Sequence, residues 1–184
     1  HGKKDKNSFY EIDKIVERIA RDEKLFTFLK DCPADSEVVI GDGRLEIAKA
    51  KNGRYGLIIV DAFGSDAIPV HLLTKEAFKL YFEKLKPGGM LMLHVSNRYM
   101  KLEKIIAPIA DEYGFTAITN SIANINENKD KKTRAFRASW VALINNDKDR
   151  NELINKFGWS ALPVDKTIKL WTDDYSNIFS AINF

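Results

Sequence analysis

Acidic side chains stand close behind each of the first three segments that we expect to be β-strands. These side chains are Glu11, Asp13, Asp42 and Asp61. A carboxylate can accept hydrogen bonds, hold a cation or accept a proton. In open parallel sheets, ligands bind outside the carboxyl ends of the strands. The four acids therefore mark the edge of the predicted sheet where we expect chemistry.

The clearest positioning element is the stretch from residue 55 to residue 97. Its first run, LIIV at 57–60, is too continuous for a strand with one wet face and predicts a strand buried on both faces. A loop follows, then a helix that Thr74 begins and a Pro-Gly-Gly turn ends, then a second apolar run at 90–95. Together they predict one βαβ unit with a right-handed crossover. The residues expected at its functional edge are Asp61, Asp66, His94, Ser96 and Asn97.

The order of the elements predicts an α/β fold. Strand, acid and helix recur three times, as in a nucleotide-binding Rossmann-like sheet that is mostly parallel with helices on both faces. The last two expected strands, at 115–122 and 138–144, form an antiparallel hairpin in this interpretation. No linker or repeat divides the 184 residues, so we expect a single domain, 1–184. The glycine-rich turn that normally follows the opening strand is missing, so either the chain was cut just after it or the fold does without it.

The composition argues against several classes of protein. The formal net charge of +3 is too small to indicate a nucleic-acid or membrane partner. No apolar run approaches the roughly 18 residues of a membrane span, and no signal peptide is visible. The single cysteine, Cys32, excludes an intrachain disulfide and gives no metal cluster. We expect a soluble, cytoplasmic protein without a metal.

Six stretches of the sequence carry a family likeness. They are FYEID at 9–13, LFTFLKDC at 25–32, VVIGDGRL at 38–45, LIIVDAFGSDAIPVHLLT at 57–74, LKPGGMLMLHVSNRY at 85–99 and WTDDYSN at 171–177. LKPGG alone is common to many methyltransferases, whereas DAFGSDAIPVHLLT is much more specific. Together they resemble the spermidine synthase-like (aminopropyltransferase) family of the class I S-adenosylmethionine-dependent transferase fold. The likeness covers nearly the whole chain and implies a class I methyltransferase-like fold, N-terminally truncated.

The resemblance implies roles for the acids of the first two strands. The family's acid after the second strand binds the ribose hydroxyls of the nucleoside, which places this role on Glu11, with Asp13 beside it. The family's pair after the third strand contacts the adenine, and Asp42 with Gly43 matches it. The alternatives are structural: Asp13 fits a helix N-cap, and Asp-Gly makes a plain turn in any protein.

The resemblance also implies a catalytic carboxylate. Asp61 matches the aspartate that assists the attacking amine in aminopropyltransferases, and Asp66 is the candidate for a second acid. The spacing departs from the family motif, because Ala67 and Ile68 separate Asp66 from Pro69. The alternative for Asp61 is electrostatic support of a bound sulfonium without proton transfer. We expect His94, inside an apolar run, to be a hydrogen-bonded structural histidine.

The function implied by the resemblance is transfer of an aminopropyl group from decarboxylated S-adenosylmethionine to a polyamine such as putrescine. Two alternatives remain: a small-molecule methyltransferase that uses S-adenosylmethionine, and a non-catalytic domain that retains the fold. The expected partner is a small-molecule amine, and a homodimer stays open. Because the family's first strand and glycine loop are missing, the strands at 8–12 and 57–60 would pair directly, bind another chain, or belong to a fragment. Activity of this chain without the missing part is left open.

Overall fold

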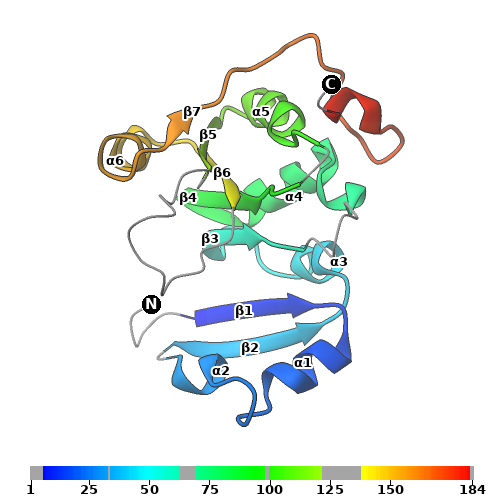
Figure 1. Cartoon of the computed structure of the whole chain (residues 1–184), viewed down its shortest axis with the longest axis vertical. Helices are drawn as coiled ribbons and strands as arrows, with labels where there is room; N and C mark the ends of the chain where they lie inside the picture. Colours follow the sequence, from blue (N-terminus) through cyan, green and yellow to red (C-terminus); the bar gives the residue numbers. More distant parts are fainter. Residues whose placement is uncertain (1–5, 33, 63–68, 98–99, 122–137, 183–184) are drawn as a thin grey trace, which may run out of the picture. The chain divides into compact units, whose positions relative to one another are not determined.

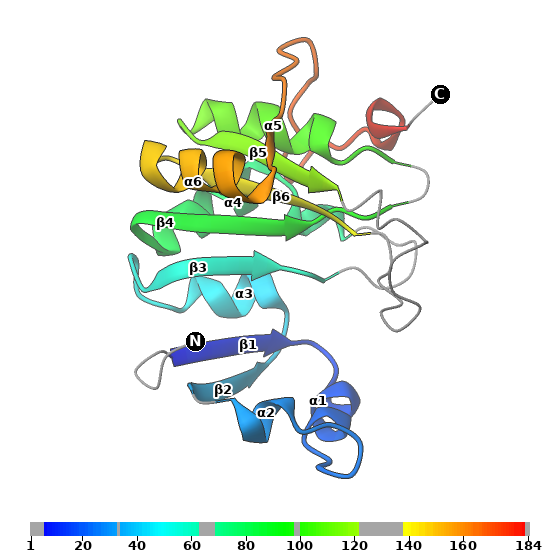
Figure 2. The ribbon, with the colours of Figure 1, turned by 60° about the vertical axis from the view of Figure 1, so that its left-hand side comes forward.

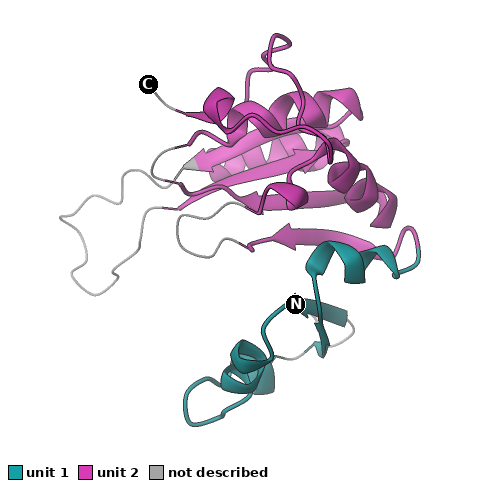
Figure 3. Cartoon of the chain, turned by 90° about the vertical axis from the view of Figure 1, so that its right-hand side faces the viewer, with its two compact units in different colours: residues 1–51 teal, residues 52–184 magenta. Residues whose placement is uncertain are grey.

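The structure is a computed structural model, and it describes residues 6–32, 34–62, 69–97, 100–121 and 138–182. The chain divides into two compact units, His1–Lys51 and Asn52–Phe184, which are coloured separately in Figure 3. We describe each unit by itself. None of the described helices is long and apolar enough to cross a membrane.

The first unit is built on a parallel pair of strands. β1 (Lys6–Glu11) pairs with β2 (Asp35–Ile40) in the register that sets Glu11 opposite Ile40. Three short helices accompany the pair in Figure 1: α1 (Lys14–Ala20), α2 (Phe28–Asp31) and α3 (Gly43–Ala48). The expected order of strand, acid and helix is confirmed here, although both strands begin two residues earlier than the apolar pattern indicated.

The second unit contains a mixed five-stranded sheet. Its strands are β3 (Tyr55–Val60), β4 (Leu85–His94), β5 (Thr116–Ser121), β6 (Ser139–Ile144) and β7 (Ser160–Ala161). Their spatial order is β3-β4-β6-β5-β7, and Figure 2 shows β6 between β4 and β5. β3 and β4 pair in parallel, whereas β6 is antiparallel to both β4 and β5. The predicted α/β class and the antiparallel hairpin are confirmed, but the insertion of β6 leaves β3–β4 as the one parallel pair that this unit shows among its described strands.

Helices cover both faces of this sheet. Side chains alternate between the faces along a strand. On one face, two methionines of β4 and two residues of α6 (Asp147–Phe157) pack against the same buried cluster of Ile118, Ala142 and Ile144; they are Met90, Met92, Leu153 and Ile154. The opposite face of β4 carries Leu91 and Leu93, which are fully buried. α4 (Lys75–Lys84) and α5 (Glu103–Glu112) lie on that side in Figures 1 and 2. The core of the unit is therefore a three-layer arrangement.

The prediction that the run at 57–60 is buried on both faces is wrong for the described structure. Ile58 and Val60 are buried, but Leu57 is 43% exposed and Ile59 is 54% exposed. β3 is an edge strand of its sheet, hydrogen-bonded within the described residues to β4 alone. Ile58 and Val60 pair with Leu91 and Leu93, so they lie on the face that α4 and α5 cover.

The Pro-Gly-Gly segment belongs to β4 rather than to the end of the preceding helix. α4 ends at Lys84, and β4 begins at Leu85. A Cβ atom at Gly89 would lie 2.9 Å from the carbonyl oxygen of Lys86 and 3.2 Å from that of Gly56 in β3. Gly89 is therefore needed where the two strands first approach each other, at a register shift between Tyr55 and Leu57.

The C-terminal tail is tied to the start of α4 through Thr74. The hydroxyl of Thr74 caps α4 by accepting from the backbone N–H of Ala77, and it donates to Asp173 Oδ1 at 2.7 Å. The backbone of Lys75 donates to the carbonyl of Trp171 at 2.8 Å. Trp171 is fully buried and Thr74 is 1% exposed. The WTDDYSN stretch thus secures the helix that joins β3 to β4.

Replacing Thr74 should destabilise the second unit. Thr74→Ala removes both the helix cap and the bond to Asp173, so we expect a loss of about 2 kcal/mol in the free energy of unfolding. Thr74→Ser keeps the hydroxyl and should lose less than half as much. Urea unfolding followed by tryptophan fluorescence measures both, and equal losses would mean that the hydroxyl contributes little.

Candidate functional site

The carboxyl ends of β1 and β2 meet at one edge of the first unit. The backbone N–H of Gly41 donates to the carbonyl oxygen of Glu11 at 2.9 Å, one residue beyond the last paired position of β2. Glu11 and Asp42 therefore leave neighbouring strands at the same edge, as the sequence predicted. The structure brings these two predicted residues together, with Asp13 two positions beyond Glu11.

Glu11 and Asp13 both accept backbone hydrogen bonds at the start of α1. Glu11 Oε1 accepts from the N–H of Asp13 at 2.8 Å, and Asp13 Oδ1 accepts from the N–H of Ile15 at 2.7 Å. Asp13 is the N-cap of α1, so the structural alternative stated for it is confirmed. A carboxylate has two oxygens and about four acceptor positions. The two backbone hydrogen bonds fix the orientation of the Glu11 and Asp13 carboxylates and leave each with capacity to accept from a ligand.

Asp42 occupies the same kind of position at the start of α3. Its Oδ1 accepts from the N–H of Leu45 at 3.0 Å, which makes it the N-cap of that helix. A Cβ atom at Gly43 would meet Tyr10 Cβ at an ordinary 3.8 Å, so crowding in the described structure does not require glycine there. Gly41 is different, because its φ of 151° disfavours other residues and a Cβ would lie 2.7 Å from Glu46 Cγ. Sequence reasoning did not single out Gly41, although it precedes the Asp-Gly pair directly.

Asp61 lies beyond the end of β3 in the second unit and contacts the last residue of β4. Its Oδ1 lies 2.7 Å from His94 Nδ1. The side chain of Asp61 is 56% exposed and that of His94 is 26% exposed. The parallel pairing of β3 and β4 sets Val60 opposite Leu93, so the next residue of each strand reaches the same edge. The structure thus joins two residues that the sequence placed at one edge.

The hydrogen bonds continue from His94 to Ser96. His94 Nε2 lies 2.7 Å from Ser96 Oγ, which accepts from the backbone N–H of Ser139 at 2.8 Å. The imidazole also stacks on Trp140 of β6, with ring centroids 4.8 Å apart and 25° between the planes. No local sequence pattern signals the contact of Trp140 with His94, because β4 and β6 are distant in the chain.

Asp66 and Asn97 were also predicted for this edge. Asp66 lies outside the described residues. Asn97 accepts at its Oδ1 from the backbone N–H of Met100 at 3.0 Å. His94 is hydrogen-bonded, as expected.

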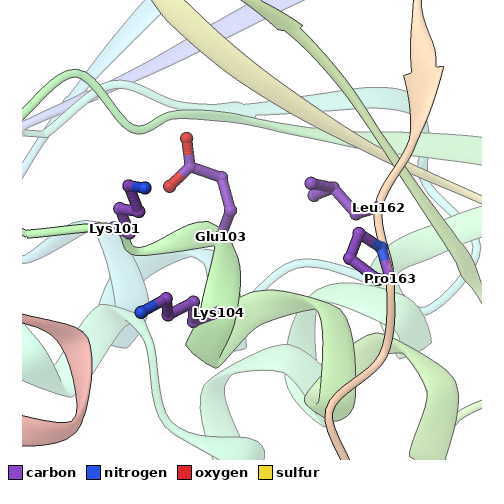
Figure 4. A pocket seen from close by; sticks show the side chains of 5 residues that line it. All are labelled: Lys101, Glu103, Lys104, Leu162 and Pro163. Atoms are coloured by element: carbon purple, nitrogen blue, oxygen red, sulfur yellow. The ribbon is translucent and has the colours of Figure 1, made fainter. Parts of the chain in front are cut away.

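A separate cavity of about 250 Å³ lies at the start of α5 (Figure 4), lined by Lys101, Glu103, Lys104, Leu162 and Pro163. None of the predicted site residues lines it. Two ammonium groups against one carboxylate make it unsuitable for a cationic amine. In the described part of the chain, no cluster of three or more His, Cys, Asp or Glu side chains is arranged to hold a metal ion.

Comparison with known proteins identifies two curated relatives with polyamine chemistry in their names. The chain is 36% identical over 66 residues to a "Probable polyamine aminopropyl transferase" of Bifidobacterium longum, and 36% identical over 84 residues to a "Polyamine aminopropyltransferase" of Vibrio vulnificus. These matches cover 36% and 45% of this chain, but 15% and 27% of the relatives. The chain therefore matches about a quarter or less of each relative's length. No family model matches.

Solved structures share the fold. A probable spermidine synthase from Corynebacterium glutamicum has a TM-score of 0.58 at 18% identity, over 76% of this chain and 47% of that chain. A spermidine synthase in complex with the transition state analogue AdoDATO has a TM-score of 0.56 at 15% identity, over 95% of this chain and 65% of that chain. The chain therefore shares the fold of these two solved structures. In each unit, the predicted acids that the structure describes lie at or just beyond the ends of strands: Glu11 and Asp42 in the first unit and Asp61 in the second.

Substitution can separate the contribution of Asp42 as a helix N-cap from the contribution of its charge. Asp42→Ala removes the N-cap of α3 and should destabilise the first unit by about 1 kcal/mol, whereas Asp42→Asn keeps an amide oxygen that can cap the helix. Hydrogen exchange at the Leu45 amide measures the difference directly. If exchange is equally fast in both variants, the charge of Asp42 rather than its capping geometry stabilises the helix.

Proposed function

We propose that this chain forms part of an aminopropyltransferase that moves the aminopropyl group of decarboxylated S-adenosylmethionine to a polyamine such as putrescine. The observation that carries the proposal is the Asp61 carboxylate, which is exposed beyond β3 while His94 holds its Oδ1 at 2.7 Å. The likeness to two polyamine aminopropyltransferases supports it. The proposal includes a cytoplasmic location and a role in polyamine biosynthesis, with a homodimer left open.

The reaction requires a group of this kind. An alkyl amine with a pKa of about 10 is protonated at neutral pH and has no lone pair for attack. Asp61 would accept one proton from the ammonium group and direct the nitrogen at the carbon next to the sulfonium. The nitrogen lone pair then forms the new C–N bond. The C–S bond breaks with its electron pair on sulfur, so a neutral thioether nucleoside leaves.

The nucleoside part of the proposal concerns the first unit. We assign the ribose hydroxyls to Glu11, with Asp13 beside it, and the adenine to Asp42 and Gly43. Both assignments are compatible with the backbone hydrogen bonds of these acids, since a carboxylate has about four acceptor positions and the backbone N–H occupies one of them. The AdoDATO complex of a structural neighbour supports an S-adenosylmethionine-related ligand for this fold.

Calorimetric titration with methylthioadenosine, S-adenosylmethionine and decarboxylated S-adenosylmethionine tests the proposal. We expect the decarboxylated form to bind most tightly. Glu11→Gln and Asp42→Asn keep a side-chain oxygen that can accept the same backbone N–H but remove the charges, and each should weaken nucleoside binding by about 1–3 kcal/mol. Asp22→Asn is the matched control, because Asp22 also accepts a backbone N–H in the first unit, from Lys24, but belongs to no proposed site.

Each outcome of the titration discriminates between functions. Tighter binding of S-adenosylmethionine than of its decarboxylated form would favour the methyltransferase alternative. Unchanged affinity in both acid variants would refute the nucleoside assignments. Binding of none of the three ligands would refute the proposal for this chain and favour a non-catalytic domain.

A further inference from the structure

A continuous hydrogen-bond chain runs from a backbone amide of β6 to the Asp61 carboxylate. The N–H of Ser139 lies 2.8 Å from Ser96 Oγ, which lies 2.7 Å from His94 Nε2. His94 Nδ1 in turn lies 2.7 Å from Asp61 Oδ1. Three separate segments contribute: the start of β6, the end of β4 with the residues after it, and the residue after β3.

The donor and acceptor capacity of each group determines the direction of the hydrogen bonds between Ser139 and Asp61. A backbone N–H can only donate, so Ser96 Oγ is the acceptor from Ser139. An ionised carboxylate can only accept, so the 2.7 Å contact with Asp61 Oδ1 makes Nδ1 of His94 a donor. A neutral imidazole that carries its hydrogen at Nδ1 has an acceptor at Nε2. The one hydrogen of the Ser96 hydroxyl is then donated to Nε2.

Packing holds the imidazole in this orientation. His94 and Trp140 are paired residues of β4 and β6, and their rings stack with 25° between the planes. The neighbouring N–H of Val95 donates to the carbonyl of Ser139 at 2.8 Å, which fixes the backbone on both sides of the contact. The imidazole is 26% exposed, whereas Asp61 is 56% exposed. The ring is thus constrained while the carboxylate remains accessible to a ligand.

We propose that His94 is a positioning residue for Asp61, held as the Nδ1–H tautomer between the Asp61 carboxylate and the Ser96 hydroxyl. The imidazole engages Oδ1, so that Oδ2 is presented to the ammonium group of a bound amine. This inference rests on the proposed function for its ligand, but the tautomer can be measured without any ligand. It assigns to His94 and Ser96 a role beyond the structural one expected from the sequence.

The first test is the tautomer of His94. Long-range proton–nitrogen NMR correlation, at a pH where imidazole rings are neutral, distinguishes the Nδ1–H from the Nε2–H form. We expect Nδ1–H for His94, and a loss of that preference in Asp61→Asn together with Ser96→Ala. His71→Gln identifies the His71 signal and should leave that of His94 unchanged. An Nε2–H tautomer in the unsubstituted protein would overturn the proposal.

The second test compares two amides in place of the imidazole. The side-chain nitrogen of Asn stands as many bonds from Cβ as Nδ1, so His94→Asn can still donate to Asp61. His94→Gln places its nitrogen near the position of Nε2 and should lose that bond. With 1,4-diaminobutane as the probe, we expect affinity within about twofold of the unsubstituted protein for Asn, and about three- to tenfold weaker binding for Gln.

The outcomes separate this inference from the proposed function. Equal affinities of the Asn and Gln variants, both folded by circular dichroism, would overturn the positioning role while the diamine site survived. If the unsubstituted protein binds no diamine, the proposed function fails and the positioning role fails with it. In that case the tautomer result still decides whether the hydrogen-bond chain exists as a structural device.

Discussion

The register of β4 against its two neighbours decides which side chains meet at the edge of the second unit. Parallel pairing with β3 sets Leu93 opposite Val60, and antiparallel pairing with β6 sets His94 opposite Trp140. Because side chains alternate between faces, a slip of one residue would turn His94 to the other face and expose the fully buried Leu93. Burial of the leucines therefore also fixes the imidazole beside Asp61.

The sequence predicted where helices and strands lie along the chain better than it predicted which of them pack side by side. The acid behind each strand was correctly placed at a strand end, because periodicity and breakers are local signals. Three features depended on partners that local patterns do not contain: the position of β6 between β4 and β5, the exposure of Leu57 and Ile59, and the contact of His94 with Trp140. Asp61 and His94 could be placed at one edge from the sequence, but their hydrogen bond required the register between β3 and β4.

The acids of the first unit show why structural and functional interpretations of a carboxylate need not compete. A helix that begins at the end of a strand has unpaired N–H groups, and the acid at that point accepts one of them. The bond orients the carboxylate and leaves acceptor capacity at the same edge. Asp13 and Asp42 are N-caps in this sense, so capping alone does not argue against ligand binding.

The two units differ greatly in the apolar surface that they bury. All the large, fully buried side chains in the described residues belong to the second unit, with Trp171 and Phe78 the largest. The buried hydrophobic residues of the first unit are Ala34 and Ile47, while Ile12 is 72% exposed and Leu25 is 62% exposed. Since burial of apolar area is the main favourable term in folding, the first unit has the smaller stability of its own.

This difference links ligand affinity to folding in the first unit. A ligand that binds only the folded form stabilises it in proportion to the logarithm of its concentration over its dissociation constant. A nucleoside held by Glu11 and Asp42 would therefore order the unit that carries them. Conversely, a substitution that removes a helix cap lowers apparent affinity even when it touches no ligand. The charge of Asp42 can be judged only in a variant such as Asp42→Asn, in which the cap of α3 is retained.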